Sequence, residues 1–138
     1  MLSNKLAKTQ IKFYNIIKGV FVLYTSYYGS KKCGEAIDAG RFIVSISRSE
    51  PKWLEVDAKF SILAPSYELF HNQDLSNEEW EELYYKQLDK YEAQVIDILC
   101  YLETKEAVLC CWCKDYSNCH RSFLTKWAKK HNITIKEL

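Results

Sequence analysis

The sequence AVLCCWC at 107–113, followed by KDYSNCHR at 114–121, decides the fold that we predict. Its first seven residues are apolar without polar alternation, which is typical of a strand covered on both faces, as in a parallel sheet. The eight residues that follow are mostly polar, and Asn118 is a suitable N-cap for a helix over 119–130. A buried strand that leads through a loop into a helix is the repeating unit of an α/β fold.

Further strands and helices surround this unit. The runs Val20–Ser26 and Phe42–Ser47 predict two more buried strands, and Ile133–Lys136 predicts a final edge strand. A short helix is expected to end at Ala39, where Gly40 stops it. Strands that alternate with helices predict an α/β fold with a small, mostly parallel sheet flanked by helices, a flavodoxin- or Rossmann-like three-layer sandwich.

The segment between the second and third buried strands is predicted to be mainly helical. Ser76 and Glu79 have the spacing of a capping box, in which each side chain bonds the backbone N–H of the other residue. From Trp80 to Leu102, apolar residues recur every three or four positions. This spacing predicts a long amphipathic helix, in which a kink is left open. Phe60–Leu63 is expected to form a short strand or a turn.

Length and composition limit the classes of function. A chain of 138 residues predicts one domain over 1–138, and a formal net charge of +1 argues against duplex DNA as a partner. Apolar runs such as Gly19–Tyr24 are far shorter than the roughly 20 residues of a membrane span, and no signal peptide is evident. We therefore expect a cytoplasmic protein with no membrane partner. Thr9–Ile17 is ambiguous between strand and helix, and a homo-oligomer is left open.

The polar residues that follow the strands predict a site for a small anionic ligand, such as a nucleotide. Ligands of parallel sheets bind outside the carboxyl ends of the strands. The free N–H groups at the start of a helix over 119–130 would attract an anion there, and arginine would add a bidentate grip. The predicted ligand-binding residues are Tyr27, Tyr28, Ser30, Arg48, Lys114, Arg121 and Ser122. Structural roles remain open for several of them, including an ion pair of Arg121 with Asp115 or Glu79.

Cys119 and His120 are the candidate catalytic residues if the protein is an enzyme. A cysteine at a helix N-terminus is expected to have a lowered pKa, which would make Cys119 a nucleophile, and His120 could act as a general acid or base. A buried, hydrogen-bonded structural histidine is an equally good interpretation of His120. The phosphatase signature of Cys, five residues and Arg is out of register here, because Arg121 falls two positions late after Cys113.

The six cysteines are expected to be free thiols, and no metal or cofactor is predicted. The side chains of Cys111, Cys113, Cys119 and His120 carry the sulfur and nitrogen atoms that zinc binds, so a zinc site is an alternative interpretation. The objection is that adjacent helical residues such as Cys119 and His120 diverge by about 100°. A reversible disulfide between Cys113 and Cys119 is a further possibility.

Several motifs along the chain together resemble the domain-of-unknown-function 488 family. Phe42–Ser47 followed by RSEP at 48–51 is similar to the family's V-D-V-R-x-x-P segment, and LAPSYEL at 63–69 is similar to its L-A-P-S-x-E-L stretch. Cys119-His120-Arg121 is similar to its terminal C-H-R signature, and the resemblance covers about 19–131. Two positions depart from the pattern: Ser45 stands in place of an aspartate, and Cys113-Lys114 replaces an acidic residue.

The resemblance implies a small α/β fold with a pocket built from Arg48, the loop after the first strand, and the C-H-R residues. It also implies a setting in bacteria and their phages, so that sequestration of a nucleotide signal in counter-defence is one expected role. An enzyme acting on nucleotides or nucleic-acid components is a second. A third is an inhibitor module that binds another protein through the aromatic helix residues Tyr84, Tyr85, Tyr91 and Tyr101.

Overall fold

A five-stranded, wholly parallel sheet forms the centre of the molecule. The computed structural model describes residues 22–138. The strand order is β3-β2-β4-β1-β5, and every neighbouring pair is parallel. The strands are β1 (Leu23–Tyr27), β2 (Ile43–Ser45), β3 (Ala58–Lys59), β4 (Val108–Cys111) and β5 (Ile135–Glu137). The predicted parallel sheet is confirmed, and β5 lies at one edge as expected.

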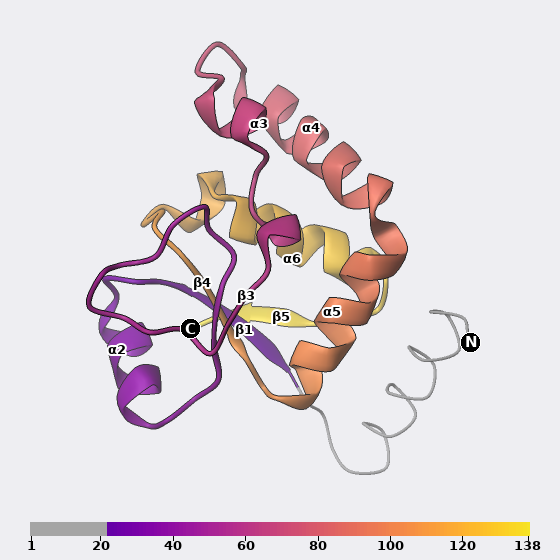
Figure 1. The fold of residues 1–138 in the computed structure, drawn as a ribbon. Coiled ribbons are helices and arrows are strands. Elements are labelled where there is room, and N and C mark those ends of the chain that lie inside the picture. The colour runs from indigo at the N-terminus through magenta and orange to yellow at the C-terminus, as the bar shows by residue number, and fades with distance from the viewer. Residues whose placement is uncertain (1–21) are drawn as a thin grey trace.

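Helices cover both faces of this sheet and make the predicted three-layer sandwich (Figure 1). On one face, α2 packs against the sheet, and on the other face α5 and α6 do so. The helices are α2 (Lys31–Asp38), α3 (Tyr67–His71), α4 (Asn77–Lys90), α5 (Glu92–Thr104) and α6 (His120–Lys130), with 3-10 turns η1 (Ser61–Leu63) and η2 (Tyr116–Asn118). Gly40 follows α2 with a φ of 73°, which confirms it as the predicted stop.

The apolar run of β4 is explained by burial on both faces of the sheet. All four of its residues are buried. Val108 and Cys110 face the small core beneath α2, whereas Leu109 and Cys111 face the larger core formed with α4, α5 and α6. Successive strand residues point to opposite faces, so a strand between two helical layers needs apolar residues at every position. This alternation also decides that Cys111 points toward α6.

The kink left open for the long helix is present, and one other local prediction is wrong. The long helix is divided in two at Tyr91, whose backbone (φ −118°, ψ 31°) leaves the helical region between α4 and α5. The N-cap of α6 is Cys119, not Asn118. The Asn118 side chain is occupied instead, because it donates to Asp115 Oδ2 at 2.8 Å and accepts from the Asn77 amide at 3.1 Å.

The remaining local predictions have mixed outcomes. The segment Phe60–Leu63 contains η1, with β3 just before it, so the turn alternative holds. The first buried strand is shifted toward its carboxyl end, and its predicted residues Val20 and Phe21, like Thr9–Ile17, lie outside the described residues.

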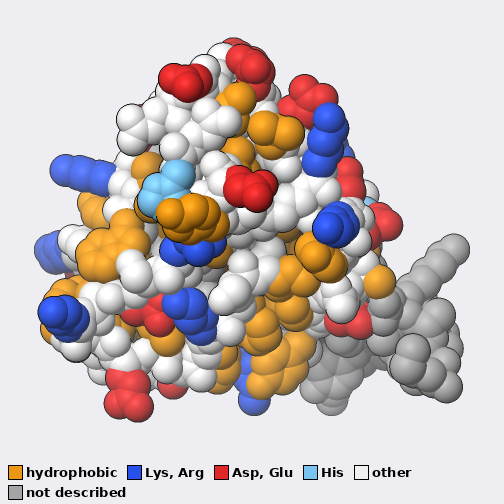
Figure 2. Space-filling model, turned by 45° about the horizontal axis from the view of Figure 1, so that its top comes forward, with side chains coloured by type: hydrophobic (Ala, Val, Ile, Leu, Met, Phe, Trp, Pro, Cys, Tyr) orange, Lys and Arg blue, Asp and Glu red, His pale blue; other side chains and the backbone are white. Residues whose placement is uncertain are grey.

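Charged groups of both signs are mixed on the surface. On the face shown in Figure 2, hydrophobic, basic and acidic side chains are interspersed, without a broad area of one charge sign. Within residues 22–138, no helix combines the length and hydrophobicity that crossing a membrane requires.

We expect Ser76→Ala to lower the free energy of unfolding by about 1 kcal/mol. The predicted capping box is present: the Ser76 hydroxyl accepts from the Glu79 N–H at 3.1 Å, and the Glu79 carboxylate accepts from the Ser76 N–H at 3.2 Å. Urea denaturation monitored by circular dichroism measures the change. Ser76→Thr, which keeps a hydroxyl, is the matched control, and equal losses in the two variants would contradict a role for the cap.

Candidate functional site

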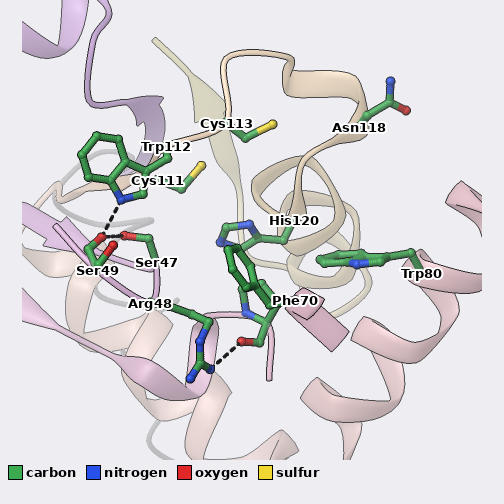
Figure 3. Close-up of a pocket in the computed structure, with 11 residues that line it drawn as sticks. Ser47, Arg48, Ser49, Phe70, Trp80, Cys111, Trp112, Cys113, Asn118 and His120 are labelled. Carbon is green, nitrogen blue, oxygen red and sulfur yellow. Dashed lines mark hydrogen bonds between the residues drawn. The ribbon is translucent and has the colours of Figure 1, made fainter. Parts of the chain in front are cut away.

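A cavity of about 400 Å³ opens at the carboxyl ends of β2 and β4 (Figure 3). The segment after β2 contributes Ser47, Arg48 and Ser49, and the end of β4 contributes Cys111 to Cys113. Aromatic and apolar side chains from α3, α4 and the loops close it, namely Phe70, Trp80, Trp112 and Pro65. Its size and mixed lining are those of a site for a small molecule.

Arg48 is the one cationic side chain among the described residues that line the cavity. It donates to the Pro65 carbonyl at 3.2 Å, and its guanidinium lies 5.3 Å from the centre of the Tyr67 ring. None of the ion pairs within residues 22–138 involves Arg48. Among residues 22–138 its partners are therefore a carbonyl dipole and an aromatic face, and an anion in the cavity would meet a cation that no carboxylate of these residues pairs with.

The Trp112 indole forms one wall of the cavity, and contacts with Ser49 and Tyr28 fix its orientation. Its indole N–H donates to the Ser49 carbonyl at 2.8 Å, and the Tyr28 ring meets it edge-on, with 5.1 Å between centres. The buried Tyr28 hydroxyl is hydrogen-bonded to the hydroxyls of Ser45 and Ser47 at 3.0 and 2.8 Å. The indole therefore has a fixed orientation, although it is 54% exposed and accessible to a ligand.

The departure at Ser45 is compensated by a neighbouring carboxylate. The Ser45 hydroxyl donates to Glu50 Oε2 at 3.1 Å, and Lys59 forms an ion pair with the same oxygen at 2.7 Å. A negative charge thus lies beside position 45, supplied by the following loop instead of by the strand.

Arg121 lies behind the cavity and does not line it. Its side chain is fully buried and forms an ion pair with Glu137 of β5 at 2.7 Å. It also donates to the sulfurs of Cys111 and Cys119, each at 3.3 Å, and to the Cys113 carbonyl. Burial alone would lower the pKa of Arg121, but the bonds to Glu137 and Cys111 raise it above its ordinary value. Neither Asp115 nor Glu79 is its partner.

The other predicted ligand-binding residues are dispersed around the sheet edge. Tyr27 faces the Arg121 guanidinium, 5.7 Å from the ring centre, and Ser30 caps α2 by accepting from the Cys33 N–H. Ser122 is buried and donates to the Cys119 carbonyl at 2.8 Å, and Lys114 is exposed outside the cavity lining. Of the predicted site residues, Arg48 and His120 therefore line the cavity, Tyr28 lies behind Trp112, and the others do not line it.

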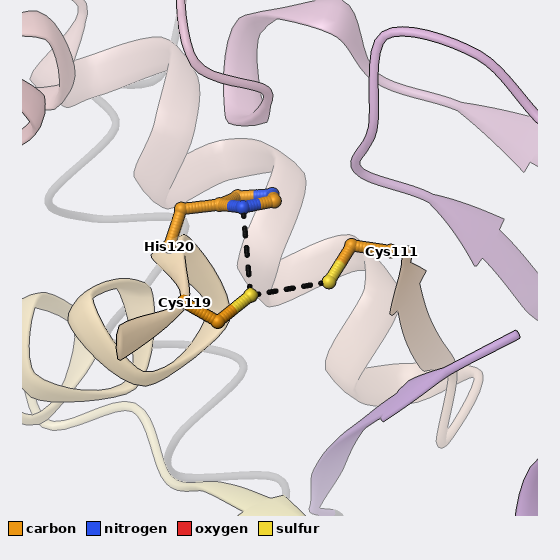
Figure 4. Close-up of side chains that lie close together, drawn as sticks. All are labelled: Cys111, Cys119 and His120. Carbon is orange, nitrogen blue, oxygen red and sulfur yellow. Dashed lines mark hydrogen bonds between the residues drawn. The ribbon is translucent and has the colours of Figure 1, made fainter. Parts of the chain in front are cut away.

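Cys111, Cys119 and His120 converge behind the cavity wall (Figure 4). The two sulfurs are 3.2 Å apart, and the Cys119 sulfur is 3.7 Å from His120 Nδ1. Cys113, which we considered as a partner of Cys119, is instead exposed and bonds the Asp115 carbonyl. All six cysteines are free thiols in the structure.

The pKa shifts in this cluster differ from the lowered pKa that the sequence predicts for Cys119. The pKa of Cys111 is lowered to about 7, because Cys119 donates a hydrogen bond to it and Arg121 lies beside it, and together these effects outweigh burial. The pKa of Cys119 is raised, not lowered, because its hydrogen is shared with Cys111 and its side chain is buried. Burial lowers the pKa of His120 to about 4, so the ring is neutral at pH 7. The catalytic roles of Cys119 and His120 stay predictions.

The sequence interpretation missed Phe70, Trp80 and Pro65 as cavity residues. Pro65 lies in the LAPSYEL motif, so a signal was available for it. Phe70 and Trp80 belong to α3 and α4, and the Trp80 indole N–H donates to the Leu69 carbonyl at 3.2 Å. Nothing in the helical spacing distinguishes these aromatic residues from core residues, because both uses require an inward-facing position.

A family model matches most of the chain. The model DUF488-N3a, described as "Active DUF488-N3 subclade", matches residues 30–132. The chain belongs to the DUF488 family. DUF488 is the domain-of-unknown-function 488 family that the motifs resemble, and the match runs from the N-cap of α2 to just beyond α6. No curated protein and no solved structure matches the chain. Within DUF488, the roles of this chain's residues therefore have to be argued from its own geometry.

Proposed function

We propose that the cavity binds a small anionic ligand with a flat ring, most simply a nucleoside monophosphate. The observation that carries this proposal is the combination, in one cavity, of the exposed Trp112 face with Arg48, which has no carboxylate partner within residues 22–138. Stacking of a base on an aromatic side chain is worth about 1–3 kcal/mol, and a hydrogen bond to a charged group about 1.5–3 kcal/mol. Together the two contacts favour a ligand that has both a base and a phosphate.

The N-terminus of α6 adds to this preference for an anion. His120 is the first residue of α6 and lines the cavity, so the positive end of the helix dipole lies at the cavity wall. The neutral His120 ring adds no charge of its own. The proposal thus keeps the predicted location and ligand class, and of the predicted cationic contacts to phosphate it keeps Arg48 but not Lys114 or Arg121.

We expect Arg48→Ala to weaken the binding of AMP at least tenfold and to leave adenosine binding nearly unchanged, because only the phosphate contact is removed. Isothermal calorimetry with AMP, adenosine and inorganic phosphate measures the three affinities. Trp112→Ala should weaken AMP and adenosine alike, because it removes the stacking surface.

Arg41→Ala is the matched control for charge. Arg41 is also a surface arginine, but it lies over the Tyr24 ring and donates to the Glu106 carbonyl, outside the cavity lining. Its removal should change no affinity. Failure of all four ribonucleoside monophosphates to bind the unaltered protein, or equal losses in the Arg41 and Arg48 variants, would reject the proposal.

A further inference from the structure

We propose that Cys111, Cys119 and His120 form a zinc site with three protein ligands. Their ligand atoms, two sulfurs and one ring nitrogen, all lie within 4.8 Å of one another (Figure 4). Two cysteines and one histidine are a known zinc ligand set, and thiolate with imidazole favours zinc over the harder Mg²⁺ and Ca²⁺. The site adjoins the proposed nucleotide cavity, but its ligands do not include Arg48 or Trp112.

The distances are close to those that a tetrahedral zinc ion requires. With Zn–S bonds of about 2.3 Å and Zn–N bonds of about 2.0 Å, tetrahedral geometry places two sulfurs about 3.8 Å apart and a sulfur and a nitrogen about 3.5 Å apart. The structure has 3.2 Å between the sulfurs and 3.7 Å between Cys119 Sγ and His120 Nδ1. The third pair, Cys111 Sγ and the His120 ring nitrogen, lies within 4.8 Å. Side-chain rotations that move the ligand atoms by about half an ångström to one ångström would admit the ion.

The conformation of Cys119 removes the objection that the sequence raised. Adjacent side chains diverge by about 100° when both residues are helical. Cys119 is not helical: it is the extended N-cap of α6, with φ −114° and ψ 147°. Its sulfur can therefore point to the same side as the His120 ring, while Cys111 approaches from the end of β4.

His120 is oriented as a metal ligand. Its Nε2 lies 2.7 Å from the Ile46 carbonyl, which can only accept, so Nε2 carries the hydrogen. The Nδ1 atom of the neutral ring then presents its lone pair toward the Cys119 sulfur, 3.7 Å away. A histidine that binds a metal through one nitrogen usually donates its other N–H to a carbonyl or carboxylate, and this contact fixes the tautomer.

Arg121 and Glu137 complete the surroundings of the site. Two thiolates and one zinc ion are neutral together, and the buried Arg121 charge is already balanced by Glu137. The guanidinium N–H groups at 3.3 Å from each sulfur would stabilise the two thiolates as outer hydrogen bonds. The charges of the cluster therefore add to zero with the ion bound.

The fourth coordination position faces the cavity. Cys111 and His120 both line the cavity wall, and among the described residues no fourth cysteine, histidine or carboxylate joins their group. A three-ligand zinc ion with an open position binds water or a ligand atom there. The geometry thus places an exchangeable zinc ligand at the floor of the cavity.

The test uses the full chain, stripped of metal with a chelator under reducing conditions and titrated with Co²⁺ and then Zn²⁺. We expect one Co²⁺ per chain, with the intense visible and thiolate charge-transfer absorption of tetrahedral thiolate coordination, and displacement by one Zn²⁺. Azide should shift the visible bands by entering the open position. Unchanged bands with azide would overturn the open position, and absence of Co²⁺ and Zn²⁺ uptake would overturn the site.

Cys119→Ser and His120→Ala should lose this absorption, whereas the matched control Cys113→Ser should keep it. Cys113 is exposed and outside the cluster. In case a variant fails to fold, the unaltered chain gives a second readout: an ion that binds the folded chain raises its Tm, so Zn²⁺ should raise the Tm of the metal-free protein. An unchanged Tm, or loss of the Co²⁺ spectrum in Cys113→Ser, would overturn the proposal. Arg48→Ala should keep the metal, so failure of nucleotide binding and failure of the metal site are distinguishable.

Discussion

Glu137→Ala is expected to lower the free energy of unfolding by about 3 kcal/mol. The substitution leaves the Arg121 guanidinium fully buried without a carboxylate, and removal of one partner from a buried pair costs about 3–5 kcal/mol. The lower end applies because the Glu137 side chain is 27% exposed, so water reaches the position that it vacates. Urea denaturation followed by tryptophan fluorescence measures the loss.

A surface ion pair provides the matched control. Lys86 and Glu82 are one helical turn apart on α4, and their side chains are 68% and 70% exposed. Glu82→Ala should change the free energy of unfolding by less than about 0.5 kcal/mol. Replacing Arg121 and Glu137 together by methionine should restore much of the loss, because no buried charge is then left unpaired. A loss for Glu137→Ala as small as that for Glu82→Ala would contradict this account of the pair.

Leu109→Ala is expected to lower the free energy of unfolding by about 3–5 kcal/mol. Leu109 is fully buried in the central strand β4, in register with Thr25 of β1 and Val44 of β2. The substitution removes buried apolar atoms and leaves a cavity between the sheet and the helices of the larger core, and both effects destabilise the folded state.

Leu83→Ala on α4 is the control for the chemical change alone. The Leu83 side chain is 41% exposed, so its truncation should cost less than about 1 kcal/mol. Chemical denaturation of both variants gives the comparison. Similar losses would show that the sheet can relax around position 109.

Local chemistry is what the sequence predicted best. The capping box at Ser76 and the glycine stop at Gly40 depend on residues within four positions of one another, and both are present. The continuous apolar run of β4 predicted a strand covered on both faces, which is correct because strand geometry alone sends alternate residues to opposite faces. The sequence pattern did not locate the break at Tyr91 between α4 and α5. It also did not predict the N-cap of α6, because the Asn118 side chain is hydrogen-bonded to Asp115 and Asn77 in the folded protein.

The sequence predicts a site at the carboxyl ends of the strands, a cavity opens there, and only part of the predicted residue set lines it. The carboxyl ends of parallel strands meet at one edge, so Arg48 and His120 were expected near each other, and both line the cavity. The pairing of Arg121 with Glu137 was beyond the sequence, because β5 returns beside β1 only in the folded sheet.

The sequence by itself determined the α/β class, the parallel sheet and the edge at which the cavity lies, because periodicity, helix caps and strand burial follow from neighbours in the chain. Only the tertiary structure decided which arginine side chain near the cavity pairs with a carboxylate. Arg48 meets a carbonyl and a ring, whereas Arg121 meets a carboxylate. It likewise brought Cys111 to Cys119 and His120. Such partnerships join separate elements, and their geometry depends on how helices pack on the sheet, which no local pattern encodes.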